Sequence, residues 1–322
     1  SQTAKGEEIM NLLIHLTDPV QNSEFEDKYL AGIPIDLSKV MFVFSANDIQ
    51  KIDRVLLDRM IVITLKGYDL KQKIVIAADP HNNYEKIDSI FKKEDGDINI
   101  CLGDWFDSFT LDDTSNYIAT AKYLRDVFLP NPKNYTLFGN HDIHYLFNAS
   151  TSWCSGYEQW KYDAIDKVIG KVRGDIQDKF YWSIVVDDIL LTHAGLDRRF
   201  LPPICDTNEV IFKYLDENDN DARTKLKIND LHWFYGVGHA RGGNLKAGGI
   251  VWCDFDHEFQ PIDDLKQIVG HTNQWETGKA AQYHREGFAS IVDANNICID
   301  CNLSQYITIT NGKIELKNYS DM

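Results

Sequence analysis

The sequence predicts an α/β fold in which two β-sheets form a sandwich with helices on the outside. Short continuous apolar runs alternate with amphipathic, helix-like segments along most of the chain, as in parallel strands joined by helices. Near the C-terminus the pattern changes to short runs separated by turn residues, which is typical of antiparallel strands. The chain has 322 residues and is 43% hydrophobic, so it can bury a sizeable core in one large domain or two ordinary ones.

The first seventy residues predict a small α/β segment. Residues 7–16 carry apolar side chains at helical spacing, and Asp18-Pro19 ends that helix. Residues 40–44 form a continuous apolar run that predicts a buried strand. Residues 52–60 predict a helix, and residues 61–65 predict a second buried strand.

From Lys73 the alternation restarts, so we expect two domains, residues 1–72 and 73–322. Residues 290–292, 297–299, 306–310 and 314–316, the last two joined by a turn at Asn311-Gly312, predict antiparallel strands of the second sheet. The other expected strands are 74–77, 98–102, 135–138, 189–192, 249–253 and 268–270, and the expected helices are 84–91 and 117–128.

Two further segments have a distinct composition. Residues 145–179 are rich in aromatic side chains, and their 158–172 part is amphipathic, which predicts a helical insertion. This insertion either covers the edge of the sheet or caps the site and selects the substrate. Residues 216–221 are acidic and rich in Asn, which predicts a solvated loop between helices.

The composition narrows the class of partner and the compartment. The net charge of -16 argues against a nucleic-acid or anionic-membrane surface, but it permits a small phosphorylated substrate whose charge is met by bound metal ions. No apolar run is long enough to span a membrane, and there is no signal-peptide pattern. The six cysteines, including Cys298 and Cys301 in an expected strand, fit buried free thiols in the cytoplasm rather than a zinc knuckle. Because the first residue is Ser, we expect a chain that is processed, truncated or cut from a longer one.

Polar side chains with metal-binding or acid–base chemistry follow five of the expected strands. Each one alone is most simply a turn, a helix cap or a core histidine, but together they indicate a site, because ligands bind at the carboxyl ends of strands in open α/β sheets. In chain order they are Asp79 and His81, Asp104 and Asp107, Asn140 and His141, His193, and His271.

This set of residue types suits the hydrolysis of a phosphate ester. Two divalent metals held by a bridging carboxylate lower the pKa of a shared water and clamp the phosphoryl oxygens. Mixed His, Asp and Asn ligands suit manganese, iron or zinc, with manganese favoured here. A nearby His can give the departing alkoxide its proton.

Residues 7–72 resemble the Lon-type AAA+ ATPases. The motifs that carry the resemblance are Asp18-Pro-Val-Gln-Asn, Tyr29-Leu, Pro34-Ile-Asp-Leu-Ser-Lys-Val, Ser45-Ala-Asn, Leu56-Leu-Asp-Arg-Met and Gly67-Tyr. The resemblance implies a sensor-1 position at Asn47 and an arginine finger at Arg59. The chain has no G-x-x-x-x-G-K-[ST] loop and no strand ending in Asp-Glu before this segment, so ATP hydrolysis by this chain alone is not expected. The segment is then a remnant or an assembly artefact, or it docks on a separate AAA+ partner.

Residues 73–315 resemble the calcineurin-like metallophosphoesterases, which include the Ser/Thr protein phosphatases. The motifs are Asp79-x-His81, Gly103-Asp104-x-x-Asp107, Gly139-Asn140-His141, His193 and Gly270-His271. The resemblance implies that Asp79 and His81 bind one metal, that Asp104 bridges two, and that Asn140, His193 and His271 bind the second. It also implies that His141 is the general acid and that Asp107 orients it.

Three positions depart from the Ser/Thr-phosphatase pattern or from the wider family. Asn273 stands where many members have another His, Ser108 stands where that branch has a phosphate-gripping Arg, and Asp142 replaces its Glu. Arg241 is the candidate replacement for the phosphate grip, with Asn140 as a second substrate contact. We expect His144 and His239 to be rim or structural residues.

The sequence therefore predicts a metal-dependent phosphoester hydrolase that acts on phosphomonoesters, either phosphorylated proteins or small molecules. One alternative is a phosphodiesterase or nuclease, against which the acidic charge and Asn273 both count. The alternative from another class is an interaction module that docks on an AAA+ ring.

Overall fold

The computed structural model describes residues 12–14, 16–18, 22–26, 32–44, 52, 54–57, 72–108, 110–273, 289–293 and 295–321. The chain divides into two compact units, Ser1–Tyr68 and Asp69–Met322. Within the described part of the chain, no helix has the length and apolar character needed to cross a bilayer.

The described part of the first unit is small. It contains η1 (Asn22–Glu24), the antiparallel pair β1 (Phe25–Glu26) and β2 (Pro34–Ile35), and α2 (Arg54–Leu57). Residues 12–14 and 16–17 are helical, as expected. The expected strand at 61–65, Asn47 and Arg59 lie outside the described residues.

The prediction of a buried strand at 40–44 is wrong. None of these residues belongs to a strand, and Met41 and Val43 are 86% and 83% exposed. A fully buried strand needs neighbours on both sides and covering layers on both faces. In the described part of this unit, the only paired strands are the two-residue β1 and β2, which leave such a run uncovered.

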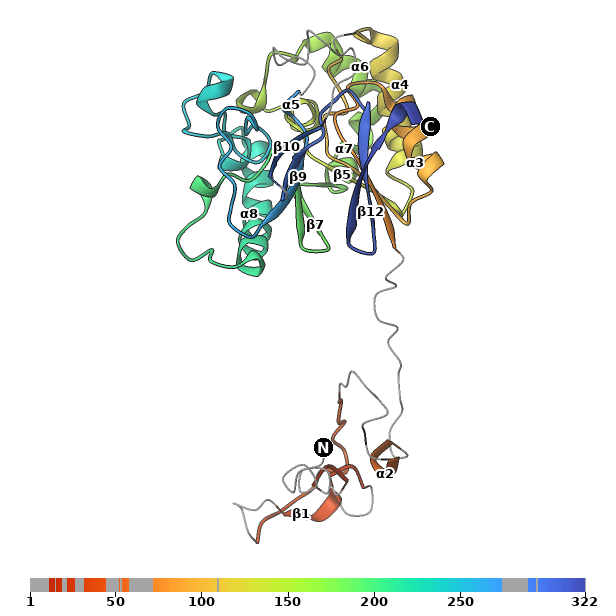
Figure 1. Ribbon diagram of the computed structural model, residues 1–322, viewed down its shortest axis with the longest axis vertical. Helices are drawn as coiled ribbons and strands as arrows, with labels where there is room; N and C mark the ends of the chain where they lie inside the picture. The colour runs from red at the N-terminus through yellow and green to blue at the C-terminus, as the bar shows by residue number, and fades with distance from the viewer. Residues whose placement is uncertain are drawn as a thin grey trace. The chain divides into compact units, whose positions relative to one another are not determined.

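The second unit contains the expected two-sheet sandwich with helices outside (Figure 1). The first sheet has the order β13-β12-β3-β4-β5-β6, and β3 to β6 are parallel. Its strands are β3 (Lys73–Ala77), β4 (Ile98–Cys101), β5 (Asn134–Leu137), β6 (Phe180–Tyr181), β12 (Gln305–Thr310) and β13 (Lys313–Asn318).

The second sheet has the order β10-β11-β9-β8-β7, and its three central strands are parallel. Its strands are β7 (Ser183–Val186), β8 (Ile189–Thr192), β9 (Lys266–Val269), β10 (Ser290–Asp293) and β11 (Asn296–Cys298). Placing all the C-terminal strands in this sheet was wrong, because β12 pairs antiparallel with β3 and joins the first sheet together with β13.

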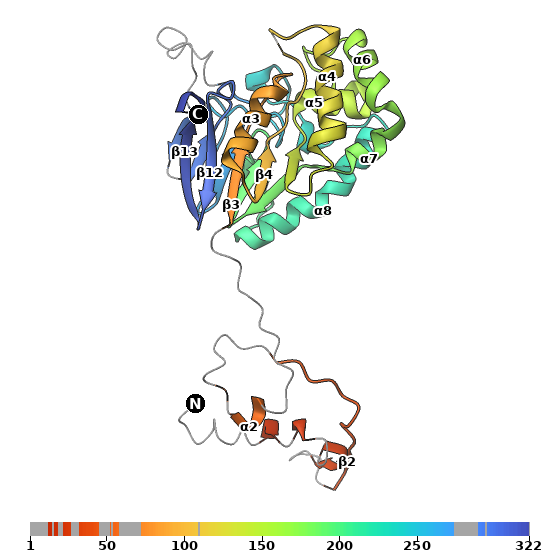
Figure 2. The same ribbon diagram turned by 90° about the vertical axis from the view of Figure 1, so that its right-hand side faces the viewer.

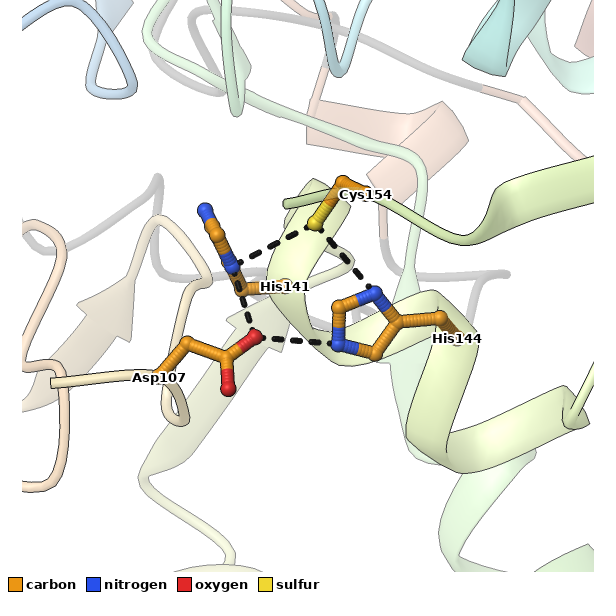
Figure 3. A group of neighbouring side chains, drawn as sticks. All are labelled: Asp107, His141, His144 and Cys154. Carbon is orange, nitrogen blue, oxygen red and sulfur yellow. Dashed lines mark hydrogen bonds and ion pairs between the residues drawn. The ribbon is translucent and has the colours of Figure 1, made fainter. Parts of the chain in front are cut away.

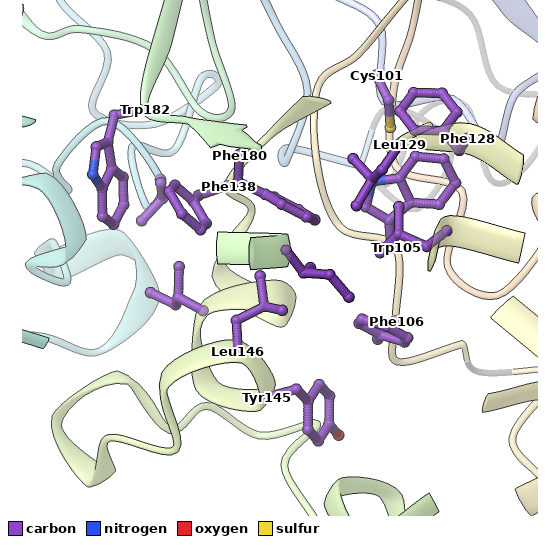
Figure 4. Packing of buried hydrophobic residues seen from close by; sticks show 14 of the residues in the cluster. Cys101, Trp105, Phe106, Phe128, Leu129, Phe138, Tyr145, Leu146, Phe180 and Trp182 are labelled. Carbon is purple, nitrogen blue, oxygen red and sulfur yellow. The ribbon is translucent and has the colours of Figure 1, made fainter. Parts of the chain in front are cut away.

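Alternate residues of each strand supply two cores. Ile74 and Ile76 of β3 face the second sheet and pack in one cluster with Leu191 and Ile268. Val75 belongs to the larger cluster under the helices, which is rich in aromatic side chains such as Trp105, Phe128, Phe138 and Phe180 (Figure 4). This period of two is what a strand buried on both faces requires.

The helices cover the sheets from outside (Figure 2). They are α3 (Tyr84–Glu94), α4 (Thr114–Tyr123) with its π-helical continuation η3 (Leu124–Phe128), α5 (Asn140–Phe147), α6 (Gln159–Ile169), α7 (Arg173–Gln177) and α8 (Asn208–Lys227). Short 3-10 turns are η4 (Ser150–Ser152), η5 (Gly170–Val172), η6 (Arg198–Phe200), η7 (Trp233–Tyr235), η8 (His239–Arg241) and η9 (Tyr319–Asp321).

Two local predictions in this unit were wrong. Residues 216–221 lie inside α8, where the acidic side chains pair with bases four residues on, as in Asp219–Arg223 at 2.6 Å. Residues 249–253 form a buried turn, not a strand: the N–H groups of Trp252 and Cys253 both donate to the Gly249 carbonyl. A Cβ at Gly249 would lie 1.8 Å from the Trp233 carbonyl oxygen, so only glycine permits this close approach.

Candidate metal centre and general acid

The parallel strands bring five chain segments to one edge of the sandwich. Asp79 follows β3, Asp104 follows β4, Asn140 begins α5 after β5, His193 follows β8 and His271 follows β9. The two ends of this series, Asp79 and His271, are 192 residues apart in sequence, yet the His271 N–H lies 3.1 Å from Asp79 Oδ1. The expected strand-end residues therefore do meet.

Asp104 lies at the middle of the assembly. Its Oδ2 is 3.3 Å from His193 Nε2 and 4.0 Å from His81 Nε2. It belongs to two groups of potential ligands, Asp79–His81–Asp104 and Asp104–His193–His271, and within each group the donor atoms lie within 4.8 Å of one another. This shared position is what a bridging ligand requires.

Asn140 completes the second of these groups. Its Oδ1 lies 3.0 Å from His193 Nε2 and 2.8 Å from His271 Nδ1. A neutral amide oxygen therefore faces the same point as the two imidazoles. We call Asp79, His81, Asp104, Asn140, His193 and His271 the proposed metal centre.

The backbone of this centre is strained. Asp79, His81, Asp104 and His271 have φ values of 53°, 42°, 56° and 65°, in the left-handed region that residues with a Cβ rarely adopt. Such residues cost about 1–3 kcal/mol each and cluster at functional sites. A Cβ on Gly139 would also lie only 2.0 Å from Asp104 Oδ1, so this position admits only glycine.

The centre concentrates buried negative charge. Burial, together with the charges of Asp300 and Asp104, raises the pKa of Asp79 well above its ordinary value. Burial also opposes the charge of Asp104, but His193 and His141 hold its pKa well below the ordinary value. Nε2 of His271 is buried and has no hydrogen-bond partner among the described residues. Buried carboxylates, imidazole nitrogens and an amide oxygen that face one another fit divalent cations.

His141 stands beside this centre at the start of α5. Its main-chain N–H donates to Asp104 Oδ1 at 2.9 Å, and its Nδ1 lies 2.7 Å from Asp107 Oδ2. Burial lowers the pKa of His141, but the negative charges of Cys154 and Asp104 and the contact with Asp107 raise it well above its ordinary value. Because Nδ1 is engaged by Asp107, Nε2 is the nitrogen left to exchange a proton.

Asp107 is held by more partners than the sequence indicated. The hydroxyls of Tyr145 and Tyr117 donate to its Oδ1 at 2.6 and 3.2 Å, and Lys161 Nζ lies 3.5 Å from the same oxygen. Tyr145 and Lys161 belong to the segment expected to be an insertion, so this segment reaches the His141–Asp107 pair. Lys161 is buried although it lies on the amphipathic helix α6, and no spacing in the sequence signalled this contact.

Two further carboxylates near the centre were also missed. Asp142 accepts N–H groups from Asp104 and Trp105, each at 2.8 Å, and from Gly139 at 3.0 Å. It occupies the third helical position of α5, where an acidic side chain commonly caps the helix. Burial and the charge of Asp104 raise the pKa of Asp142 to about 7.

Asp300 is the second missed carboxylate. It follows β11, which runs parallel to β9, so the strand-end rule applied to the other five positions also reaches it. It is 5% exposed, and burial together with the charge of Asp104 raises its pKa to about 6.

The predicted substrate contacts lie in two different settings. Arg241, in η8, pairs through Nε with Asp254 Oδ2 at 2.9 Å. Burial and the charge of His193 are the main causes that lower the pKa of His271, and the charge of Arg241 lowers it further. Asn140 lies within the centre itself. Ser108 only caps its own loop, because its Oγ accepts the N–H groups of Thr110 and Leu111. His239 is exposed, with Nδ1 near the Gly243 carbonyl.

Residues 72–274 match the family model of the calcineurin-like phosphoesterases. The chain belongs to this family. It is therefore a hydrolase that acts on phosphoesters, and the divalent metal ions that this family implies agree with the donors described above.

Solved structures with a similar fold include phosphatases. A cold-active protein-tyrosine phosphatase from a psychrophilic Shewanella species is 17% identical, with 78% of this chain and 79% of that chain covered and a TM-score of 0.48. A protein serine/threonine phosphatase from Saccharomyces cerevisiae is 16% identical, with 78% and 81% covered and a TM-score of 0.41. Likeness at this level does not extend to the substrate of this calcineurin-like phosphoesterase.

The resemblance to Lon-type proteins is confirmed for a short segment. A mitochondrial Lon protease homolog of Phaeodactylum tricornutum is 51% identical over 65 residues, which is 20% of this chain and 7% of that protein. The corresponding protein of Saccharomyces cerevisiae is 55% identical over 65 residues, or 20% of this chain and 6% of that protein. The chain thus spans less than a tenth of the length of these relatives.

Proposed function

We propose that this phosphoesterase is a phosphomonoesterase that uses two divalent cations, with manganese favoured over iron or zinc. The observation that carries the proposal is the position of Asp104. Its carboxylate belongs to both ligand groups, and it also accepts the N–H of His141. Metal ligands and a proton donor thus converge on one buried side chain.

Each ligand has a place in this proposal. Asp79 and His81 hold one cation, Asp104 bridges, and Asn140, His193 and His271 hold the other. When bound, the cations supply charge neutralisation at the phosphoryl group and an activated water nucleophile. His193 is fixed for this role because its Nδ1 lies 2.8 Å from the Leu102 carbonyl, which leaves Nε2 for the cation.

His141 gives the leaving oxygen its proton from Nε2. Asp107 orients the ring through Nδ1, and its negative charge favours the protonated imidazole. The two tyrosine hydroxyls on Asp107 keep that carboxylate in place. This arrangement matters most for substrates whose leaving group is a poor one.

Asn140 and Arg241 bind the phosphoryl group in this proposal. Because Asn140 Oδ1 faces two histidines, its Nδ2 remains to donate to a phosphoryl oxygen. Arg241 is held at Nε by Asp254, which leaves the two terminal nitrogens of the guanidinium for the phosphate. The monoester is favoured over the diester because the chain is acidic and Asn273 replaces a further histidine.

The test compares two model substrates on manganese-loaded protein. We expect release of p-nitrophenol from p-nitrophenyl phosphate but little from the bis-ester, and loss of both activity and bound metal in Asp104→Asn and His271→Ala. His239→Ala is the matched control, since this exposed histidine lies outside the metal centre. Hydrolysis of neither ester would exclude the proposal, and comparable hydrolysis of both would indicate a phosphodiesterase.

A further inference from the structure

A second set of metal-competent side chains adjoins the proposed metal centre. Asp107, His141, His144 and Cys154, which we call the His141 cluster, each offer a donor atom within 4.8 Å of the others (Figure 3). His141 and His144 are three residues apart on α5 and so share one face of the helix. Asp107 comes from the loop after β4, and Cys154 follows η4.

The distances in the cluster match those of a tetrahedral zinc site. Cys154 Sγ lies 3.5 Å from His141 Nδ1 and 3.4 Å from His144 Nδ1. Zinc bonds of about 2.3 Å to sulfur and about 2.0–2.1 Å to nitrogen separate such ligand atoms by about 3.6 Å. Asp107 Oδ2, at 2.7 Å from His141 Nδ1, has to retreat by roughly 0.7 Å to become the fourth ligand, and it gives up its 3.1 Å contact with His144 Nε2 so that His144 binds through Nδ1.

The cluster is also enclosed. His144 has no exposed side-chain surface and Asp107 has 3%. Gly156 closes over it: a Cβ there would lie 2.4 Å from Asp107 Oδ2 and 2.9 Å from His141 Nδ1. Because position 156 is a glycine, no further side chain fills the space between the four residues of the cluster.

Orienting the general acid does not account for this set. Asp107 fixes the His141 ring and is itself held by His144 Nε2 at 3.1 Å, but the thiol of Cys154 is not needed for that purpose. A thiolate, two imidazoles and a carboxylate are instead all donor types that zinc accepts, and their number matches its usual four ligands.

We propose that the His141 cluster is a third metal site, which takes zinc and inhibits the enzyme. The thiolate selects zinc over manganese, which prefers oxygen ligands. Zinc uptake displaces the thiol proton and the Nδ1 proton of His141 to solvent. The inhibitory part rests on the proposed role of His141, because an imidazole that holds a cation at Nδ1 cannot also carry the extra proton for the leaving group.

Cobalt(II), a spectroscopic substitute for zinc, tests the site without relying on catalysis. Added to manganese-loaded protein whose thiols are kept reduced, it should produce a thiolate-to-cobalt absorption in the near ultraviolet. Cys154→Ser should lose this absorption, and Cys205→Ser, a change at another half-buried free cysteine, should keep it. The proposed metal centre contains no sulfur, so the result holds even if no ester is hydrolysed. Absence of the absorption, or its persistence in Cys154→Ser, would overturn the site.

Zinc inhibition of the manganese enzyme tests the function of the site. Loss of a residue that hydrogen-bonds to a metal ligand weakens metal affinity about 10–100-fold. Removing a ligand itself should weaken zinc binding at least as much. Half-maximal inhibition of Cys154→Ser should therefore need at least about 10-fold more zinc than the unmodified enzyme and Cys205→Ser. His144→Gln, which keeps the thiol, should show the same loss of affinity if Cys154→Ser does not fold. Equal zinc sensitivity in all variants would show that the site is not inhibitory.

Discussion

The proposed metal centre and the His141 cluster are neighbours, but they are built in different ways. The centre draws its ligands from the carboxyl ends of five strands, with four of them on left-handed backbone. The cluster combines a loop, one face of α5 and the segment after η4. The sheets therefore fix the centre, whereas helical spacing and an added segment fix the cluster. This difference implies that the two can be disabled separately.

Replacing His141, the proposed general acid, should separate the metal centre from the His141 cluster most strongly. We expect His141→Ala to lower kcat by about 10²–10⁴-fold for an alkyl phosphate, the range of general acid catalysis, and much less for p-nitrophenyl phosphate. The good leaving group of the second substrate needs little help from a proton. Bound metal should be unchanged, because His141 contacts Asp104 through its main-chain N–H, which Ala retains. Measuring kcat for both substrates together with metal content checks this.

The matched comparison for that experiment is His271→Ala, which should lose metal and both activities. If His141→Ala loses its metal as well, the metal centre and the His141 cluster form one structural unit and cannot be disabled separately.

Chelation should affect stability through the metal centre alone. At a cation concentration of 100 times Kd, one site stabilises the folded protein by about 2.7 kcal/mol, which is roughly 5–10 °C in Tm for a domain of this size. We therefore expect EDTA to lower the Tm of the manganese-loaded protein by at least that amount. The measurement compares a thermal melt in excess manganese with one in which EDTA exceeds the total manganese, at the same pH.

Asp104→Asn serves as the control for this melt. With the bridging carboxylate gone, EDTA should leave its Tm unchanged, and an equal shift in both proteins would place the stabilising cation elsewhere.

The smallest effect is expected at the edge of the His141 cluster. Trp153 is 49% exposed, stacks on Tyr157 with ring centroids 4.3 Å apart, and precedes Cys154 in the chain. The Sγ of that neighbouring Cys154 lies 3.5 Å from Nδ1 of His141, the proposed proton donor. We expect Trp153→Ala to raise KM for p-nitrophenyl phosphate by about 2–10-fold, the value of one aromatic contact, with little change in kcat.

Inorganic phosphate provides the reference for Trp153, since it has no leaving group to contact the ring. Its inhibition constant should be the same in both proteins. A parallel change in KM and in phosphate inhibition would assign Trp153 to the phosphate site instead.

The sequence predicted which strand-end residues meet, because sheet geometry is regular. Once strands are recognised, parallel pairing takes Asp79 and Asp104 to one edge of the first sheet, and His193 and His271 to one edge of the second. The roles of these residues remain predictions, but their meeting point does not depend on loop detail. Asp300 follows the same rule and was missed only because β11 was expected to be antiparallel to its neighbours.

The remaining differences between the predicted and the observed structure come from effects that no local sequence pattern encodes. The apolar run 249–253 forms a turn because glycines allow contact with a distant carbonyl. The acidic run 216–221 stays helical because its charges are paired one turn away. The contacts of Tyr145 and Lys161 with Asp107 depend on how a whole segment packs, which spacing alone does not determine.

The carboxylate of Asp142 has a consequence for how the molecule opens. It binds the N–H groups of Asp104, Trp105 and Gly139, which lie in the loops after two adjacent strands. Loop amides usually exchange their hydrogens with solvent quickly, because loops open by local fluctuations. These three are instead joined across both loops by one buried acceptor. They should exchange as slowly as the amides of β4 and β5, so that this part of the active site opens only when the sheet does.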